Sequence, residues 1–446
     1  MDFLTLSVAV IGLILVISLK PIHGLIVYIS LAIWYPYCVG TVSIGTIDFS
    51  VGRIIIIPLF AKIFWGTNLT TKFKVIWLDK LVVILFATEI LAGFATTEPF
   101  RLIEYRAGDF FDMALPYFAV RLIITTKEQY ITLLKAIAWS SGVLALFAFY
   151  ESLTGHNLLA LGRSLETPEI RMRFFHRAKA TFRICIYYGV YSATVGAMCM
   201  GLLKSVKKNK SIYGVLVGLM FLGAFSSMSS GALLTMVGGL SFIAFYHYRR
   251  YWKHALIGII IMCGLVEIIS NRHFYDVIGR FTFNASTAWY RSRLFEVAFF
   301  EGGMSGHWLT GYGCFTDPGW GTKIDYRDHT DMVNHYLLKL CRYGLVGFIP
   351  FCAVIIVAIK RLFEGFWHIR NDKDTWLIWC LGAGLFGVLL AFNSVSLFGQ
   401  PMIMLFMMFG LCVMVPRVLT QSSNKFIRKK SSYLGKKELI LENYVN

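Results

Sequence analysis

Residues 397–416 read LFGQPMIMLFMMFGLCVMVP, a run of twenty residues without a charged side chain. A membrane-crossing helix needs about 20 mostly apolar residues, because it must satisfy its own backbone across ~30 Å of hydrocarbon. Twelve similar runs precede this one, at 3–19, 24–40, 52–65, 76–95, 108–125, 132–150, 184–203, 211–225, 229–247, 254–270, 336–359 and 376–392. The sequence therefore predicts an all-α, polytopic transmembrane bundle of about 12–14 spans, with 52–65 short enough to be re-entrant.

Composition supports one integral membrane domain over residues 1–446. Of the 446 residues, 57% are hydrophobic and 15% are charged, and the mean hydropathy is +0.64. A soluble protein carries roughly 25% charged residues. The net charge of +18 resides mostly in short loops and in the tail, a pattern typical of membrane topology signals rather than of nucleic-acid binding.

The short basic loops predict the orientation. Their cations are Lys204, Lys207, Lys208 and Lys210, then Arg249, Arg250 and Lys253, then Lys360, Arg361, Arg370 and Lys373, and finally those of the tail 417–446. If the helices alternate, all four segments fall on one side, which is then cytoplasmic. Loops 151–183 and 271–335 and the N-terminus then face outward.

The outer loop 151–183 is unexpectedly basic for a translocated segment. Its cations are Arg163, Arg171, Arg173, Arg177, Lys179 and Arg183. One interpretation is an anion site facing the outer leaflet. The alternative is chance, or contact with anionic lipid headgroups.

A polar loop meets an apolar run at Asn334, which we expect to cap a helix. His335, Lys339 and Arg342 follow at a spacing that places them on one helix face. We expect this face to descend over about 10 Å from the outer interface and to line a cavity, since charged groups avoid lipid. The alternative is that the two cations extend back to the interface.

Two histidines compete for the role of general base. The helix N-terminus and two cations favour a neutral His335, as a base requires. His329 lies among aspartates that favour its charged form, and that loop could instead bind a divalent cation. These aspartates are Asp325, Asp328 and Asp331.

Residues 285–298 read as a helix capped by Ser286. Its Arg291 and Arg293 are two residues apart, so at most one points into a given site. Guanidinium suits phosphate because its planar fork matches two oxygens. The nine cysteines show no CxxC spacing, and we expect no disulfide, metal or cofactor.

Several motifs in chain order resemble the O-antigen ligase and O-antigen polymerase family of bacterial envelope glycan assembly. They are Pro116-Tyr-Phe-Ala-Val-Arg-Leu-Ile, Glu151-Ser-Leu-Thr-Gly, Ala180-Thr-Phe, Ser226-Ser-Met-Ser-Ser-Gly, Arg291, Gly311-Tyr-Gly, Asn334-His-Tyr-Leu-Leu and Gly344-Leu-Val-Gly. The family usually has His immediately before the Asn, a column that holds Val333 here. His335 and His329 are the nearest histidines.

The resemblance implies transfer of a glycan from a polyprenyl (undecaprenyl) diphosphate donor at the periplasmic face of the inner membrane. The acceptor would be a hydroxyl of lipid A-core, another glycan chain or a protein. The implied catalytic residues are His335 or His329 together with Arg291. The implied substrate-binding residues are Arg177, Arg183, Arg293, Asn334, Lys339 and Arg342. Ligase and polymerase remain equal alternatives.

Two other functions compete with this one. A transporter or flippase of lipid-linked glycan would place charges in mid-membrane, whereas the charges here lie near helix ends or stand isolated, and no matching interrupted helices are visible. These charges are Asp79, Lys80, Glu89, Asp112 and Arg121. A metal-dependent glycosyltransferase would need an acidic motif in the first outer loop, where Asp48 stands alone.

Overall fold

The computed structural model describes residues 2–44, 47–66, 73–96, 99–160, 170–172, 175–206, 208–269, 285–326, 328–369 and 371–419. Several predicted features lie outside the described residues. They are Arg163, Arg173, Lys207, Arg370, residues 271–284 of the long loop and residues 420–446 of the tail.

The described chain is an all-α bundle, as predicted. Its α-helices are α1 (Asp2–Ser18), α2 (Pro21–Trp34), α3 (Val51–Gly66), α4 (Trp77–Phe94), α5 (Pro99–Asp109), α6 (Leu115–Ile123), α7 (Lys127–Thr154), α8 (Cys185–Cys199), α9 (Leu202–Ser205), α10 (Lys210–Ser226), α11 (Ser230–Ala244), α12 (Trp252–Ile269), α14 (Ala285–Phe299), α15 (Gly321–Ile324), α16 (His335–His368), α17 (Asp372–Ala391) and a final helix, Gln400–Leu419. Short 3₁₀ turns are η1 (Tyr37–Val39), η4 (Leu158–Ala160) and η5 (Phe245–Tyr251), and η3 (Phe110–Ala114) is a π-helical turn. Two antiparallel hairpins pair β1 (Val42–Ile44) with β2 (Ile47–Phe49) and β3 (Ile170–Met172) with β4 (Phe175–His176).

All thirteen predicted apolar runs fall largely on helices, but fewer are long and apolar enough to cross a membrane. Among the described residues, six helices meet that requirement: Lys127–Thr154, Cys185–Ser205, Ser230–Ile269, His335–His368, Asp372–Ala391 and Gln400–Leu419. Three apolar helices are shorter. Helix α3 has 16 residues, and α4 contains Asp79, Lys80 and Glu89. The chain is therefore a multi-pass membrane protein, while a total of 12–14 spans stays a prediction.

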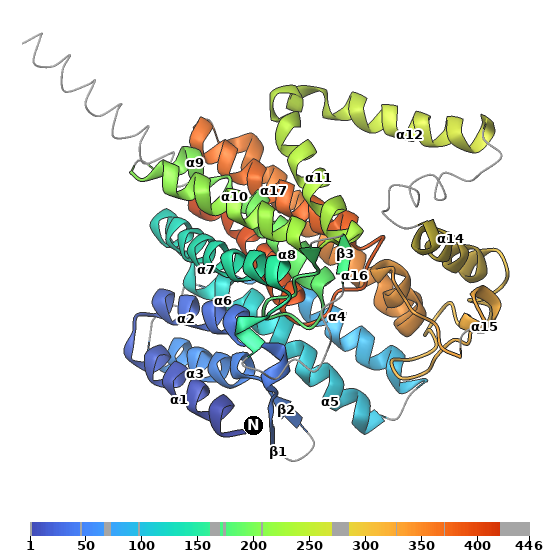
Figure 1. Ribbon diagram of the computed structural model, residues 1–446, viewed down its shortest axis with the longest axis horizontal. Coiled ribbons are helices and arrows are strands. Elements are labelled where there is room, and N and C mark those ends of the chain that lie inside the picture. Colours follow the sequence, from blue (N-terminus) through green and yellow to red (C-terminus); the bar gives the residue numbers. More distant parts are fainter. Residues whose placement is uncertain are drawn as a thin grey trace, which may run out of the picture.

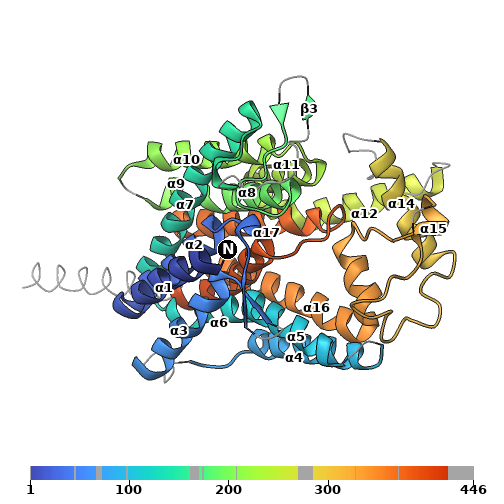
Figure 2. The same cartoon turned by 60° about the horizontal axis from the view of Figure 1, so that its bottom comes forward.

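Helix α8 lies at the centre of the bundle and is almost entirely buried. It packs against α7, α10, α11 and α17. Helices α1–α3 and helices α14 and α15 lie at opposite edges of the molecule in both views (Figures 1 and 2). Helix α12 has no buried residue and extends away from the bundle (Figure 1).

Three of the predicted basic loops meet at one end of the bundle, which we call the basic end. Lys204 Nζ lies 3.4 Å from Asp372 Oδ2 at the start of α17. The Tyr246 hydroxyl in η5 donates a hydrogen bond to the same carboxylate (2.8 Å), and Arg249 lies over the Tyr246 ring. The 20 residues of α17 extend about 30 Å, so Ala391 lies at the opposite end of a span.

Helix α16 is interrupted at Gly344, which has φ 57° and ψ −161°. A side chain at Gly344 would collide with the backbone of Leu309, since an added Cβ would lie 2.3 Å from its carbonyl atoms. The segment 308–313 supplies hydrogen bonds that the interruption removes. Tyr312 and Gly313 donate from their N–H groups to the carbonyls of Cys341 (2.7 Å) and Arg342 (3.1 Å). The Leu345 and Val346 N–H groups donate to Trp308 (2.8 Å) and Leu309 (3.2 Å).

Helix α16 must bend, because it is longer than α17 although both helices join the same two ends of the bundle. At 1.5 Å per residue, the 34 residues of α16 would extend about 51 Å when straight. Yet the His335 N–H donates to the Phe392 carbonyl just after α17 (2.7 Å), and only three residues separate the two helices at the basic end. Segment 345–368, about 36 Å long, can cross ~30 Å of hydrocarbon. Because of the kink at Gly344, the residues before it do not lie in line with segment 345–368.

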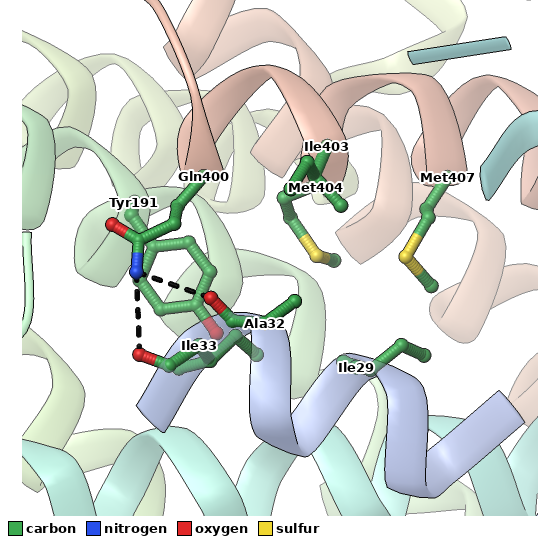
Figure 3. Close-up of a pocket in the computed structure, with 8 residues that line it drawn as sticks. All are labelled: Ile29, Ala32, Ile33, Tyr191, Gln400, Ile403, Met404 and Met407. Atoms are coloured by element: carbon green, nitrogen blue, oxygen red, sulfur yellow. Dashed lines mark hydrogen bonds between the residues drawn. The ribbon is translucent and has the colours of Figure 1, made fainter. Parts of the chain in front are cut away.

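A narrow apolar crevice lies between α2, α8 and the final helix (Figure 3). At its edge the Gln400 amide points at the last turn of α2 and donates to the carbonyls of Ala32 (3.1 Å) and Ile33 (3.5 Å). Met404 and Met407 line the crevice. These bonds fix the first turn of the final helix against α2.

Candidate functional site

The turn between α17 and the final helix, residues 392–399, collects several of the predicted site residues. His335, the first residue of α16, contacts this turn through both its backbone N–H and its imidazole ring. Its N–H donates to the Phe392 carbonyl (2.7 Å), its Nδ1 accepts from the Leu397 N–H (3.3 Å), and its ring stacks on Phe392 with centroids 4.4 Å apart. Asn334 caps the helix as predicted, since its side chain accepts from the Leu337 N–H (3.0 Å).

The bond to Leu397 determines which nitrogen of His335 carries the proton. Because Nδ1 accepts, a neutral ring must carry its proton on Nε2. The side chain is 2% exposed, and Nε2 has no hydrogen-bond partner among the described residues. A buried donor without a partner costs free energy unless a ligand satisfies it. In this arrangement His335 offers a donor, whereas the base role expected from the sequence needs a nitrogen that accepts.

Arg291 of α14 reaches the same turn. Its Nη2 donates to the Ser394 carbonyl (3.0 Å), while its buried Nε has no hydrogen-bond partner within the described part of the chain. Burial lowers the pKa of Arg291 from its ordinary value, but the guanidinium keeps its charge. Arg291 therefore brings a positive charge and a spare donor to the turn that holds His335.

Arg342 approaches this turn through Phe398. Its guanidinium carbon lies 5.5 Å from the centroid of the Phe398 ring, and that ring lies 6.3 Å from the His335 ring. The Arg342 Nη1 also donates to the Tyr105 hydroxyl (3.2 Å). His335 and Arg342 thus share a helix face, as the spacing predicts. We call His335, Arg291, Arg342 and the 392–399 turn the polar turn site.

The two arginines of the first basic loop occupy different places. Arg177 Nε donates to the Ser227 carbonyl (3.5 Å) in the serine-rich turn before α11. The next turn of that segment touches the polar turn site, because an added Cβ on Gly231 would lie 3.2 Å from Ser394 Oγ. Arg183 instead lies over the Tyr37 ring, 5.4 Å from its centroid. Arg177 therefore lies against the serine-rich turn, one segment away from the polar turn site, whereas Arg183 contacts η1.

Two other predicted phosphate ligands are paired with acids. Arg293 Nη1 bonds Glu296 (2.8 Å) and Glu301 (2.5 Å), so it points away from Arg291, in agreement with their spacing. Lys339 Nζ bonds the fully buried Glu89 (2.7 Å). Lys339 is therefore neutralised within the bundle rather than extended to the interface.

Glu89 anchors a buried ion cluster between α4, α5 and α16. Besides Lys339 it forms a close ion pair with Arg106 Nη2, and Arg106 Nη1 pairs with Asp109 (2.5 Å) and with the Tyr343 hydroxyl (3.2 Å). We call Glu89, Arg106, Asp109, Lys339 and Tyr343 the buried ion cluster. The expectation of isolated charges is therefore wrong here, because a carboxylate can be buried when cations surround it.

Asp79, Asp112 and Arg121, three of the other intramembrane charges, are paired as well. Asp79 bonds Arg121 (2.9 Å), and Asp112 bonds Arg53 (2.6 Å). The sequence could not reveal these pairs, since the partners lie on different helices.

His329 lies on the surface of the loop between α15 and α16, close to Asp317. In the described part of the chain, no group of three or more His, Cys, Asp or Glu side chains is arranged to hold a metal ion. The surface position separates His329 from the polar turn site, whose His335 is buried.

The 392–399 turn itself was missed by sequence reasoning. The sequence indicates this turn by the stretch Asn393-Ser-Val-Ser, which is polar but uncharged and separates two apolar runs. Comparison with models of known families found no match, and no curated protein sequence matches the chain.

Proposed function

We propose that this membrane protein transfers or polymerises glycan from a polyprenyl diphosphate donor onto an acceptor hydroxyl. One observation carries the proposal: the unpartnered Nε2–H of His335 and the spare guanidinium donor of Arg291 both border the 392–399 turn. Buried donors that border one turn together with a positive charge suit an oxyanion such as a diphosphate.

Each residue then has a definite task. Transfer breaks the bond between the anomeric carbon and the diphosphate oxygen, and it forms a bond from that carbon to the acceptor oxygen. Arg291 and Arg342 bind the diphosphate, and the His335 Nε2–H stabilises the charge that grows on it. The proton of the acceptor hydroxyl passes to the released diphosphate or to water. His335 is still preferred over His329 as the catalytic histidine, but it acts as a hydrogen-bond donor rather than as a general base.

The location follows from the lipid donor and the basic loops. We place the polar turn site at the periplasmic face of a bacterial inner membrane, opposite to the basic end. The acceptor is a hydroxyl of lipid A-core, of another glycan chain or of a protein, and surrounding lipids solvate the helices.

A purified system tests this function. The full chain in vesicles, given a lipid-diphosphate glycan and an acceptor, should extend or transfer the glycan without a nucleotide. The Arg291→Gln variant should lose this transfer, while Arg293→Gln should keep it, because Arg293 bonds Glu296 and Glu301 rather than the 392–399 turn. Equal activity of both variants would contradict the proposal. Loss of polymer length on gene deletion would indicate a polymerase, and retained lipid-linked polymer would indicate a ligase.

A lipid-linked glycan flippase is the second candidate, favoured by the buried ion cluster and the interrupted helix α16. It predicts movement of the lipid-linked glycan between leaflets without a change in glycan length. The same vesicles distinguish the two, because a membrane-impermeant glycosidase reports which leaflet holds the glycan.

A further inference from the structure

Segment 308–309 carries large apolar side chains that the protein leaves exposed. Leu309 is 66% exposed and Trp308 is 40% exposed. The segment belongs to the long loop whose own small core packs on α16 through residues such as Leu337 and Leu340. Two large apolar side chains exposed beside such a core indicate that lipid or another apolar surface covers them.

The backbone of this segment is fixed at the point where α16 begins its crossing. Trp308 and Leu309 accept from the Leu345 and Val346 N–H groups (2.8 and 3.2 Å), the first residues after the interruption. Segment 345–368 is about 36 Å long, slightly more than ~30 Å of hydrocarbon, so its first residues lie at or just outside one boundary. Segment 308–309 therefore lies at the same depth.

Neighbouring exposed side chains at this depth are also apolar. Ile349, one turn into the crossing part of α16, is 60% exposed. Helix α4 packs beside this part of α16, since an added Cβ at Gly347 of α16 would lie 3.2 Å from Glu89 Cγ of α4. Leu91, two residues after Glu89, is exposed. Leu309 thus continues a surface that α4 and α16 already present to lipid.

We propose that Trp308 and Leu309 insert into the membrane interface and anchor the long loop to lipid. Tryptophan favours the headgroup region, and leucine favours the acyl boundary just below it. The four hydrogen bonds between 308–313 and the interrupted α16 leave no unpaired N–H on Leu345 or Val346 at that depth. The anchor is independent of the chemistry at the polar turn site.

Site-specific fluorescence tests the anchor. The full chain, with the exposed Cys38 and the partly exposed Cys185, Cys263 and Cys352 replaced by Ser, is reconstituted in phosphatidylcholine–phosphatidylglycerol vesicles and labelled at one new cysteine with an environment-sensitive dye. The test variants are Leu309→Cys and Trp308→Cys. Ile349→Cys serves as the lipid-facing control and Tyr326→Cys as the water-facing control, since Tyr326 is almost fully exposed in the polar loop. Quenchers are a nitroxide on the lipid acyl chain and aqueous iodide.

The label at 309 should lose most of its fluorescence to the lipid nitroxide and little to iodide, as at 349. The label at 308 should respond to both quenchers, and the label at 326 to iodide alone. If 309 and 308 both behave like 326, the anchor is wrong and a soluble partner or glycan covers this surface instead. Two separate positions keep the test decisive if one variant misfolds. The readout needs no transferase activity, so it is unaffected if the proposed function fails.

Discussion

The buried ion cluster and the polar turn site contain similar groups in opposite states. In the cluster, Glu89 is enclosed by Lys339 and Arg106, and each of these three charges has an opposite partner. At the polar turn site, His335 Nε2 and Arg291 Nε are buried without hydrogen-bond partners among the described residues. Paired charges hold helices together, whereas unsatisfied donors leave binding capacity for a ligand. Residues of the buried ion cluster therefore support the fold, whereas His335 and Arg291 keep donors that the proposed function assigns to a substrate.

The largest expected effect distinguishes donation from base catalysis at His335. His335→Ala should lower transfer by about 10²–10⁴-fold. His335→Gln should recover part of this loss if His335 is a donor, because the amide N–H can replace Nε2–H. Rates are measured with a polyprenyl diphosphate donor at equal membrane abundance. His329→Ala is the matched control and should remain near wild type, because His329 lies on the surface. A dead His329→Ala with an active His335→Ala would reverse the assignment.

Neutralising Glu89 should destabilise the bundle strongly. Glu89→Gln leaves Lys339 without a carboxylate partner and Arg106 with Asp109 alone, and breaking a buried pair costs about 3–5 kcal/mol. The thermal unfolding midpoint in detergent measures the loss. Adding Lys339→Met should restore part of it, because one uncompensated cation is removed. Glu364→Gln, in a partly exposed pair with Arg361, should cost about 0–1 kcal/mol. Similar midpoints for the Glu89 and Glu364 variants would remove the structural role assigned to the cluster.

Arg291→Lys should reduce transfer by about 10²-fold, since lysine keeps the charge but loses the planar fork. Arg293 lies two residues further along α14 and is paired with Glu296, so Arg293→Lys should remain within a few-fold of wild type. Transfer rates at saturating acceptor check both variants. The contrast fails if both substitutions have the same effect, in which case the helix α14 acts as a scaffold only.

The smallest effect concerns pH and the long loop. The pKa of Asp317 lies below its ordinary value of 3.8. Partial burial of the carboxyl raises this pKa, but hydrogen bonds from the Thr330 and Gly319 N–H groups and from the Thr330 hydroxyl lower it by more. A lowered carboxyl pKa gives stability that is complete above the ordinary value and lost as pH falls through the folded one. The protection of the Thr330 amide from exchange, relative to its intrinsic rate at each pH, should therefore fall only below about pH 4. In the Asp317→Asn variant, the Thr330 amide should be less protected from exchange at neutral pH, and its protection should no longer depend on pH.

The fold class followed from the sequence because hydropathy is local, and a run such as 397–416 needs no knowledge of its neighbours. The N-cap Asn334 and the different directions of Arg291 and Arg293 also followed from local spacing. The partner of Lys339 did not, because Glu89 lies on another helix and appears in the sequence as one acid within an apolar run. The proton position on His335 was equally inaccessible, since it depends on the Leu397 N–H, which a turn far along the chain supplies.

The Ile33 carbonyl at the end of α2 has consequences for biosynthesis. It accepts from the Thr181 hydroxyl (2.6 Å) and from the Gln400 amide, and Gln400 is synthesised 367 residues later. At about 5–20 residues per second, translation takes roughly 20–70 s to cover that distance. During this interval the end of α2 lacks its last partner, and water or the insertion machinery must satisfy it. A ribosome-stalled chain that stops before residue 400 should therefore show a loosened α2 terminus, and its closure would mark the arrival of the final helix.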